Sequence, residues 1–138
     1  MTFLLDTNVV SDLRRATTPR HARLRAWVDA QVPEALGLSV VTLGEIRQGI
    51  DQLRRRDPTQ AHILGRWLDD LSVFYADRLL PVDLAVANEW GRLRALRSVP
   101  VVDALIAATA RVHRLTLVTR NVKDVAGLGV ETLDPGRT

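Results

Sequence analysis

The sequence of 138 residues contains no cysteine, which excludes disulfide bonds, thiolate metal sites and cysteine nucleophiles. Aromatic residues are also rare, at 4% of the chain, whereas 46% of the residues are hydrophobic and 25% are charged. This balance provides enough apolar side chains for one compact core. No internal repeat, low-complexity segment or long linker divides the chain. We therefore expect residues 1–138 to form a single soluble domain.

Long hydrophobic runs are absent as well. Only residues 3–5 form an apolar run before Asp6, which is too short for a signal peptide. No stretch approaches the roughly 20 apolar residues of a membrane span. The sequence thus predicts a cytoplasmic protein with no membrane partner.

Several common catalytic and binding motifs are missing. The sequence has no phosphate-binding P-loop, no G-x-G-x-x-G fingerprint and no G-x-S-x-G nucleophile elbow. Its three histidines, His21, His62 and His113, are too far apart in the sequence for a local zinc motif. Any metal ion would therefore most simply be a hard cation bound by oxygen atoms.

Lysine is almost absent, because all but Lys123 of the 19 basic residues are arginines, and the formal net charge is +3. Arginine binds phosphate through paired hydrogen bonds, but an arginine bias also arises from genome composition. The charge therefore permits an anionic partner without requiring one. The arginine run at residues 54–56 has two interpretations, a solvated helix end or an RNA contact.

Short apolar stretches alternate with amphipathic segments along the chain. The stretches predict strands at residues 3–5, 36–41, 79–82, 115–119 and 130–133. Cap residues followed by helical spacing predict helices after Asp6, Thr18, Thr42, Asp57 and Asp83, and an almost wholly apolar helix at 101–113. Strands joined by helical crossovers form parallel sheets that are covered on both faces. The predicted fold class is α/β, a three-layer α/β/α arrangement around a mostly parallel sheet of four to five strands.

Acidic and amide residues lie next to the predicted carboxyl ends of the strands. Asp6 follows the first strand and Asn121 the fourth, while Glu45 lies one helical turn after the second. Asp103 lies in the first turn of the apolar helix before the fourth strand, and Asp124 comes three residues after Asn121. Ligands of open parallel sheets bind outside the carboxyl ends of the strands, so these side chains are expected to converge on one edge.

Each acid also has a purely structural interpretation. Asp6 can end a strand, and Thr42 with Glu45 has the T-x-x-E spacing of a capping box. Asp124 lies in a loop, where a carboxylate is normally solvated. Asp103 differs, because its neighbours in the helix are apolar and burying an unpaired carboxylate costs several kcal/mol.

Gathering several carboxylates requires a counter-charge. Two carboxylates about 4 Å apart repel by roughly 4 kcal/mol at an effective dielectric constant of about 20, and a divalent cation reverses that sign. Mg²⁺ and Mn²⁺ prefer carboxylates, water and substrate phosphate as ligands. An acidic cluster without His or Cys therefore points to phosphodiester chemistry.

Four segments carry a family resemblance. They are residues 3–8 (FLLDTN), 39–45 (SVVTLGE), 103–110 (DALIAATA) and 117–121 (LVTRN), the last followed by Asp124. In this order and spacing they resemble the PIN domain, and more closely the VapC-type toxin ribonucleases of bacterial toxin–antitoxin pairs, including the FitB-like branch. The resemblance covers essentially the whole chain and implies a single PIN domain at residues 1–138.

The resemblance implies a metal site with supporting residues. The carboxylates implied to bind the metal and to be catalytic are Asp6, Glu45, Asp103 and Asp124. The residues implied to orient them or the substrate are Thr7, Asn8, Thr119, Arg120 and Asn121. Either Asn121 or Asp124 fills the fourth position of the metal site. The number of bound ions, one or two, also stays open. Thr7 and Asn8 equally suit a helix cap, and for Arg120 a surface position near a helix start is the commoner situation.

The function implied by the resemblance is hydrolysis of RNA phosphodiesters by a water that Mg²⁺ or Mn²⁺ activates, in the toxin of a type II toxin–antitoxin system. It also implies a homodimer, and a cognate VapB-like antitoxin that joins it in a hetero-oligomer and blocks the acidic pocket. The apolar residues that either line the antitoxin groove or pack in the core are Leu13, Leu24, Trp27, Val28 and Ile50. Trp67 and Trp90 are assigned to the core or to the dimer contact.

Three other functions compete with this interpretation. The first is a PIN-domain nuclease that processes RNA or acts on DNA without an antitoxin. The second is a phosphoacceptor receiver domain, which needs an acid pair after the first strand and a lysine after the last, whereas this chain has the single Asp6 and only Lys123. The third is a non-catalytic nucleic-acid-binding regulator. The acids argue against it, because an inactive site gains nothing from buried carboxylates that lower the stability of the fold.

Overall fold

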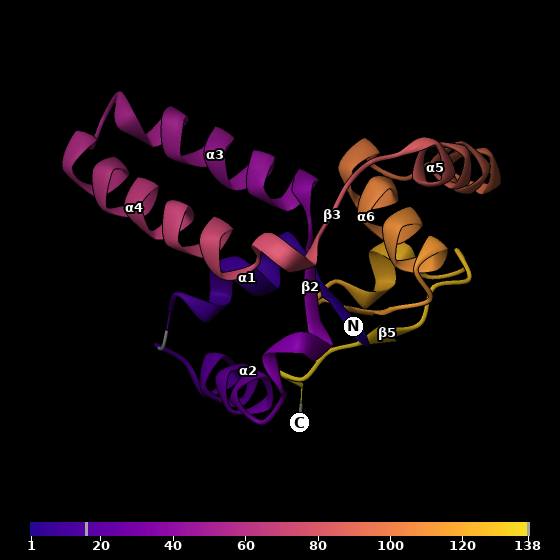
Figure 1. Cartoon of the computed structure of the whole chain (residues 1–138), viewed down its shortest axis with the longest axis horizontal. Coiled ribbons are helices and arrows are strands. Elements are labelled where there is room, and N and C mark those ends of the chain that lie inside the picture. The colour runs from indigo at the N-terminus through magenta and orange to yellow at the C-terminus, as the bar shows by residue number, and fades with distance from the viewer. Residues whose placement is uncertain (16, 138) are drawn as a thin grey trace.

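The computed structural model describes residues 1–15 and 17–137, which form a five-stranded parallel sheet (Figure 1). The strands are β1 (Phe3–Leu5), β2 (Leu36–Ser39), β3 (Leu79–Leu80), β4 (Thr116–Val118) and β5 (Thr132–Leu133). Their order across the sheet is β3-β2-β1-β4-β5, so β1 is central. Phe3 pairs with Leu36 on one side and with Thr116 on the other.

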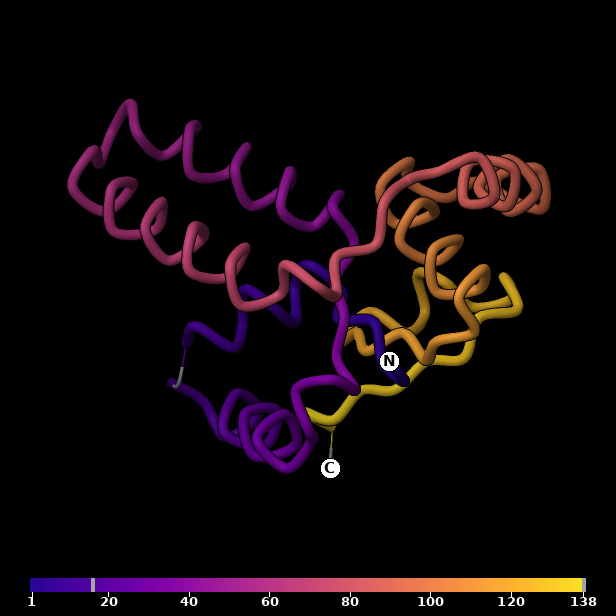
Figure 2. Tube along the Cα trace, in the orientation of Figure 1, coloured from indigo at the N-terminus to yellow at the C-terminus, as the bar shows by residue number. Residues whose placement is uncertain are grey.

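Helices cover both faces of this sheet, and Figure 2 traces the connections between them. The helices on one side are α1 (Thr7–Leu13), α2 (Pro19–Asp29), α3 (Val40–Arg54) and α4 (Pro58–Phe74). The helices on the other side are α5 (Leu84–Leu96) and α6 (Val101–Val112). Figure 1 shows α3 and α4 as a long antiparallel pair, with α5 and α6 on the opposite side of the molecule. The predicted α/β class and its three-layer α/β/α arrangement are confirmed.

The helices of the described ranges are all too short or too polar to cross a membrane.

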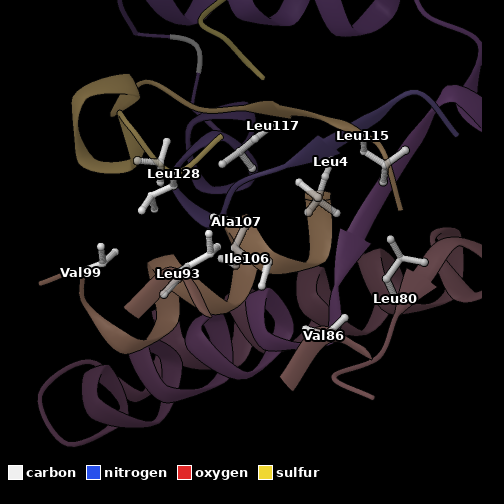
Figure 3. Packing of buried hydrophobic residues seen from close by; sticks show 14 residues of the cluster. Leu4, Leu80, Val86, Leu93, Val99, Ile106, Ala107, Leu115, Leu117 and Leu128 are labelled. Carbon is white, nitrogen blue, oxygen red and sulfur yellow. The ribbon is translucent and has the colours of Figure 1, made fainter. Parts of the chain in front are cut away.

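Side chains that alternate along the strands divide the core into two layers. Leu4 and Leu117 pack with Ile106 of α6 on one face of the sheet (Figure 3). Their neighbours Leu5 and Val118 pack against the helices of the other face. All five side chains are at most 1% exposed. Consecutive apolar residues are what a sheet buried on both faces requires.

Side-chain caps begin four helices at the expected places. Asp6, Thr18, Asp57 and Asp83 each accept a hydrogen bond from a backbone N–H in the first turn of the helix that follows. These caps explain why short polar residues separate the apolar segments, since each satisfies a donor that the helix itself leaves free.

The cap predicted at Thr42 is wrong. β2 ends at Ser39, whose Oγ accepts a hydrogen bond from the backbone N–H of Val41 at 3.1 Å, so α3 already begins at Val40. Thr42 lies inside the helix and is fully buried. The sequence pattern does not reveal the boundary between β2 and α3, because the β-branched Val40 and Val41 continue the apolar run of the strand into the helix.

The edge strands are shorter than expected. β3 ends at Leu80 because Pro81, which follows it, has no backbone N–H with which to extend the pairing. The chain reaches β5 through Gly127 and Gly129, whose φ angles of 80° and 72° lie in the left-handed region that suits glycine. The strands nevertheless all run in one direction, so their carboxyl ends share one edge of the sheet.

Leu117, which is 1% exposed, tests this description of the core. We expect Leu117→Ala to lower the free energy of unfolding by about 2–5 kcal/mol, because it leaves a cavity beside α6. Urea denaturation followed by circular dichroism measures the change. Val73→Ala, at a side chain that is 78% exposed, is the control and should cost less than about 0.5 kcal/mol. An equally small loss for Leu117→Ala would contradict the core assignment.

Candidate active site

Asp6 lies at the junction of β1 and α1, and three donors orient its carboxylate. The Thr7 backbone N–H donates to Oδ1 at 2.8 Å, while the Asn8 amide and the Thr119 hydroxyl donate to Oδ2 at 3.1 and 2.7 Å. Thr119 directly follows β4, the neighbour of β1 in the sheet. The contact therefore joins two strand ends, and it holds Asp6 at the carboxyl edge of the sheet.

Glu45 of α3 is connected to α1 by hydroxyl groups. Thr7 Oγ1 donates to Glu45 Oε1 at 2.5 Å and lies 3.0 Å from Thr42 Oγ1. Because the single Thr7 hydroxyl proton goes to the carboxylate, Thr42 is the donor in the second bond. The T-x-x-E pair is therefore not a capping box. Thr42 and Glu45 lie one turn apart on one helix face, and both meet Thr7.

Asp103 lies in the first turn of α6 and lines a small hollow together with Asp6, Asn121 and Asp124. The hollow has a volume of about 10 Å³, which is close to the space of one water-sized sphere. Asn121 and Asp124 come from the segment around the short 3-10 helix η3 (Val122–Val125). Four residues from three separate segments of the chain thus meet at one place.

The pKa of Asp103 is raised above its ordinary value. Burial is the largest cause, because it disfavours the charged carboxylate, and the negative charges of Asp6, Asp124 and Glu45 raise the pKa further. The cluster therefore includes Glu45, although that residue does not line the hollow. A divalent cation among these groups would turn their mutual repulsion into attraction.

Arg120 binds a buried acid that the sequence analysis did not single out. Its Nη1 donates to both carboxylate oxygens of Asp12, at 2.8 and 2.9 Å. Asp12 lies in α1 and is 1% exposed, and His21 Nε2 lies 3.7 Å from the same carboxylate. This pair ties the segment after β4 to α1. The sequence held one signal, since Asp12 falls on the same helix face as the apolar Val9.

The oxygen atoms at this edge suit a divalent cation chemically. Carboxylate and amide oxygens are the side-chain ligands that Mg²⁺ and Mn²⁺ prefer. Asn8 Oδ1 is buried beside Asp6 and accepts no hydrogen bond from the described residues, so it remains available to a further donor or to a cation. Among residues 1–15 and 17–137, no three His, Cys, Asp or Glu side chains are close enough to one another in this structure to hold one metal ion. Binding an ion would require the carboxylates to approach one another.

Comparison with known proteins identifies the family. The family model described as the PIN domain matches residues 3–124. The chain belongs to the PIN domain family. The match ends at Asp124, so it includes all the acids of the cluster and confirms the resemblance carried by the four sequence segments.

Relatives of this PIN domain cover nearly its whole length. It is 34% identical over 141 residues to the VapC ribonuclease Y4jK of Sinorhizobium fredii, with 96% of each chain covered. It is 31% identical to the toxin FitB of Neisseria gonorrhoeae, with 96% of this chain and 97% of FitB covered. It superposes on the crystal structure of FitAcB from Neisseria gonorrhoeae with a TM-score of 0.89 and 30% identity, covering 99% of this chain and 100% of that one.

The raised pKa of Asp103 predicts how the stability of this PIN domain depends on pH. A carboxyl group whose pKa is higher in the folded state takes up protons on folding. Stability without metal should therefore fall as the pH rises from the ordinary aspartate range through the raised pKa, and then stay low. We expect Asp103→Asn to remove this loss and to raise the Tm in EDTA at neutral pH by a few degrees.

Differential scanning fluorimetry across the acidic and neutral pH range measures this effect. Asp70→Asn is the control, because Asp70 is exposed on α4 and its substitution changes the net charge equally. Equal Tm shifts for the two variants would show that the buried, repelled charge of Asp103 does not lower the stability of the fold.

Proposed function

We propose that this PIN domain is an endoribonuclease that uses Mg²⁺ or Mn²⁺ to hydrolyse RNA phosphodiesters. The observation that carries the proposal is Asp103, a carboxylate in an otherwise apolar helix turn that lines one hollow with Asp6 and Asp124 and whose pKa is raised by burial and by three other acids. Repulsion between these acids costs stability unless a cation offsets it, and carboxylates with shifted pKa values gather preferentially at functional sites. The oxygen-only donor set suits a hard divalent cation and a phosphate substrate.

In this proposal the metal-binding and catalytic carboxylates are Asp6, Glu45, Asp103 and Asp124. A bound divalent cation would supply Lewis-acid activation of water and offset the negative charge that develops on the phosphate. The protein supplies orientation, since the groups that hold Asp6 and Glu45 are in place before substrate arrives.

The supporting residues divide into two groups. Thr7, Asn8 and Thr119 contact the carboxylates and act as positioning residues. Asn121 lines the hollow, where its neutral amide is suited to orient water or a phosphate oxygen. Arg120 is engaged by Asp12, so we assign it to fixing the segment that carries Asn121 rather than to gripping substrate.

RNA as the substrate is supported by the relatives and by charge. Y4jK is named a VapC ribonuclease. A Mycobacterium tuberculosis protein named ribonuclease VapC14 is 48% identical over 71 residues, which cover 51% of this chain. The formal net charge of +3 favours a polyanionic substrate.

We propose that the protein acts as the toxin of a toxin–antitoxin pair and binds a VapB-like antitoxin. Solved structures similar to it include FitAB bound to a DNA fragment, with a TM-score of 0.89 and 29% identity, and a toxin–antitoxin complex from Klebsiella pneumoniae, with a TM-score of 0.68 and 26% identity. A hollow of about 490 Å³ between α1, α2 and α4 is lined by Leu13, Val28, Trp67 and Phe74, among others. An apolar partner segment suits this lining.

The other candidate groove residues pack in the core instead. Leu24 and Ile50 are only 4% and 3% exposed. Trp27 packs edge-on against Phe3, with ring centroids 4.8 Å apart. Of the residues considered for antitoxin binding, only Leu13 and Val28 therefore line the hollow between α1, α2 and α4 within the described structure.

We further propose that the protein is a cytoplasmic homodimer. Leu84, Leu96 and Val101 on α5 and α6 are 77%, 66% and 47% exposed, and contact with a second copy would bury such side chains. Trp90 packs against the core beside α6, and its indole N–H donates to the Val101 carbonyl oxygen at 3.2 Å. The lack of cysteine suits a reducing compartment.

The nuclease proposal predicts metal-dependent cleavage. Purified protein should cleave cellular RNA in Mg²⁺ and stop in excess EDTA. Asp6→Asn should slow cleavage by about 100-fold or more, because a neutral amide is a weak ligand for a divalent cation. Gel electrophoresis of the RNA measures the rate, and Asp70→Asn serves as the active control. Cleavage that persists in EDTA or after Asp6→Asn would exclude the metal mechanism.

The toxin proposal predicts growth arrest. Expression of the unsubstituted protein in a host without the antitoxin should stop growth, whereas the same host expressing Asp103→Asn should grow normally. Culture density and immunoblotting for equal expression measure the difference. Equal growth of both cultures would count against toxicity without bearing on cleavage in vitro.

A further inference from the structure

A groove leads away from the acidic cluster between α1 and α3. It has a volume of about 240 Å³ and is lined at one end by Thr7 and Glu45, the hydrogen-bonded pair of the candidate active site. Its lining continues to Arg14 and Arg15, which follow α1. We call this feature the α1–α3 groove. Figure 1 shows α1 next to the α3–α4 pair, and α4 contributes Leu64 and Trp67 to the lining.

The end of the groove that is distant from the acids carries positive charge. Arg14 and Arg15 are exposed, and neither guanidinium forms an ion pair with any carboxylate of the described residues. The Arg14 guanidinium carbon lies 5.7 Å from the centre of the Trp67 ring. By contrast, Arg120 is already engaged by Asp12. The charge of the groove is thus available to an external anion.

The floor of the groove is apolar and partly open. Leu64 and Trp67 of α4 contribute to it, together with Gly49 of α3. A Cβ atom placed at Gly49 would meet nothing within 4 Å, so the helix leaves free space at this position. Unpaired guanidinium groups beside an apolar, partly aromatic surface are the elements with which proteins bind single-stranded nucleic acid.

We propose that the α1–α3 groove binds the single-stranded RNA segment next to the cleaved bond, with Arg14 and Arg15 contacting its phosphates. This inference rests on the proposed ribonuclease function. A strand in the groove would pass Glu45 and bring the adjacent phosphate to the acidic cluster. The substrate at this site is therefore unpaired RNA, because an unpaired strand can expose its bases to the apolar floor.

An antitoxin segment is the competing occupant of the groove. The hollow between α1, α2 and α4 suits such a segment better, since it is about twice as large and combines Arg14 and Arg25 with Asp29 around a mostly apolar lining. The α1–α3 groove instead reaches the acids directly, through Glu45. Its charge and its position both favour the substrate.

Binding of a labelled, mixed-sequence, single-stranded RNA tests the proposal. The full chain carries Asp103→Asn to prevent cleavage, and fluorescence anisotropy in Mg²⁺ is recorded over a range of salt concentrations. Arg14→Gln with Arg15→Gln should weaken binding about tenfold and lower the salt slope by about 1.4, that is about 0.7 for each lost phosphate contact. Arg66→Gln with Arg92→Gln, at exposed positions of α4 and α5, removes the same charge outside the groove and should have little effect.

A second pair of variants tests the groove without disturbing the fold, because one variant blocks the groove and the other is its control. Gly49→Glu should extend into the groove and weaken RNA binding about tenfold, because it removes space and adds repulsion to phosphate. Gly91→Glu is the matched control, since Gly91 also lies in a helix where an added Cβ meets nothing within 4 Å. Glutamate has a higher helix propensity than glycine, so both variants should fold.

The outcomes distinguish this proposal from the proposed function. If the Arg14/Arg15 and Gly49 variants bind RNA like their controls while the unsubstituted protein still cleaves RNA, the groove assignment is overturned and the nuclease remains. If Gly49→Glu affects only neutralisation by an antitoxin, the occupant is that partner and the proposal is wrong. If the unsubstituted protein neither cleaves nor binds RNA, the proposed function fails, and the groove assignment falls with it.

Discussion

Repulsion between carboxylates at the carboxyl edge of a parallel sheet is the constraint on which the rest of the structure depends. The sheet order places β1 between β2 and β4, so Asp6 after β1 and Thr119 after β4 are adjacent. Asp103, at the start of α6, lines the same hollow and carries a raised pKa because it is partly buried and because other acids lie near it. The core on both faces must supply the stability that this edge loses.

Two different means hold the acids in place. Hydrogen-bond donors orient Asp6 and Glu45, with Thr7 contacting both residues through its backbone and its hydroxyl group. Asp103 instead keeps its position through the packing of α6, whose following residues are almost all buried. The oriented carboxylates keep their oxygen atoms at the edge where a cation would bind. The half-buried Asp103 is suited to respond most strongly to the charge of a cation, because burial disfavours its charged form.

The surface beside the acids is divided between two hollows of different chemistry. The larger one, between α1, α2 and α4, is mostly apolar, whereas the α1–α3 groove joins unpaired guanidinium groups to the acidic edge. Both include Arg14 and Trp67 in their lining. Occupants of the two hollows would therefore meet at these residues, and a bound partner segment there would reduce access for a substrate strand.

The sequence by itself determined the alternation of strands and helices, four of the helix caps and the family, because these depend on local periodicity and on short motifs. It also indicated Asp103 as unusual, since a carboxylate among apolar residues is costly wherever it is buried. Only the tertiary structure decided that Thr42 supports Glu45 through Thr7 rather than capping a helix, and that Arg120 pairs with Asp12. Both contacts join residues far apart in the chain, and local spacing carries no information about which distant side chain completes a hydrogen bond.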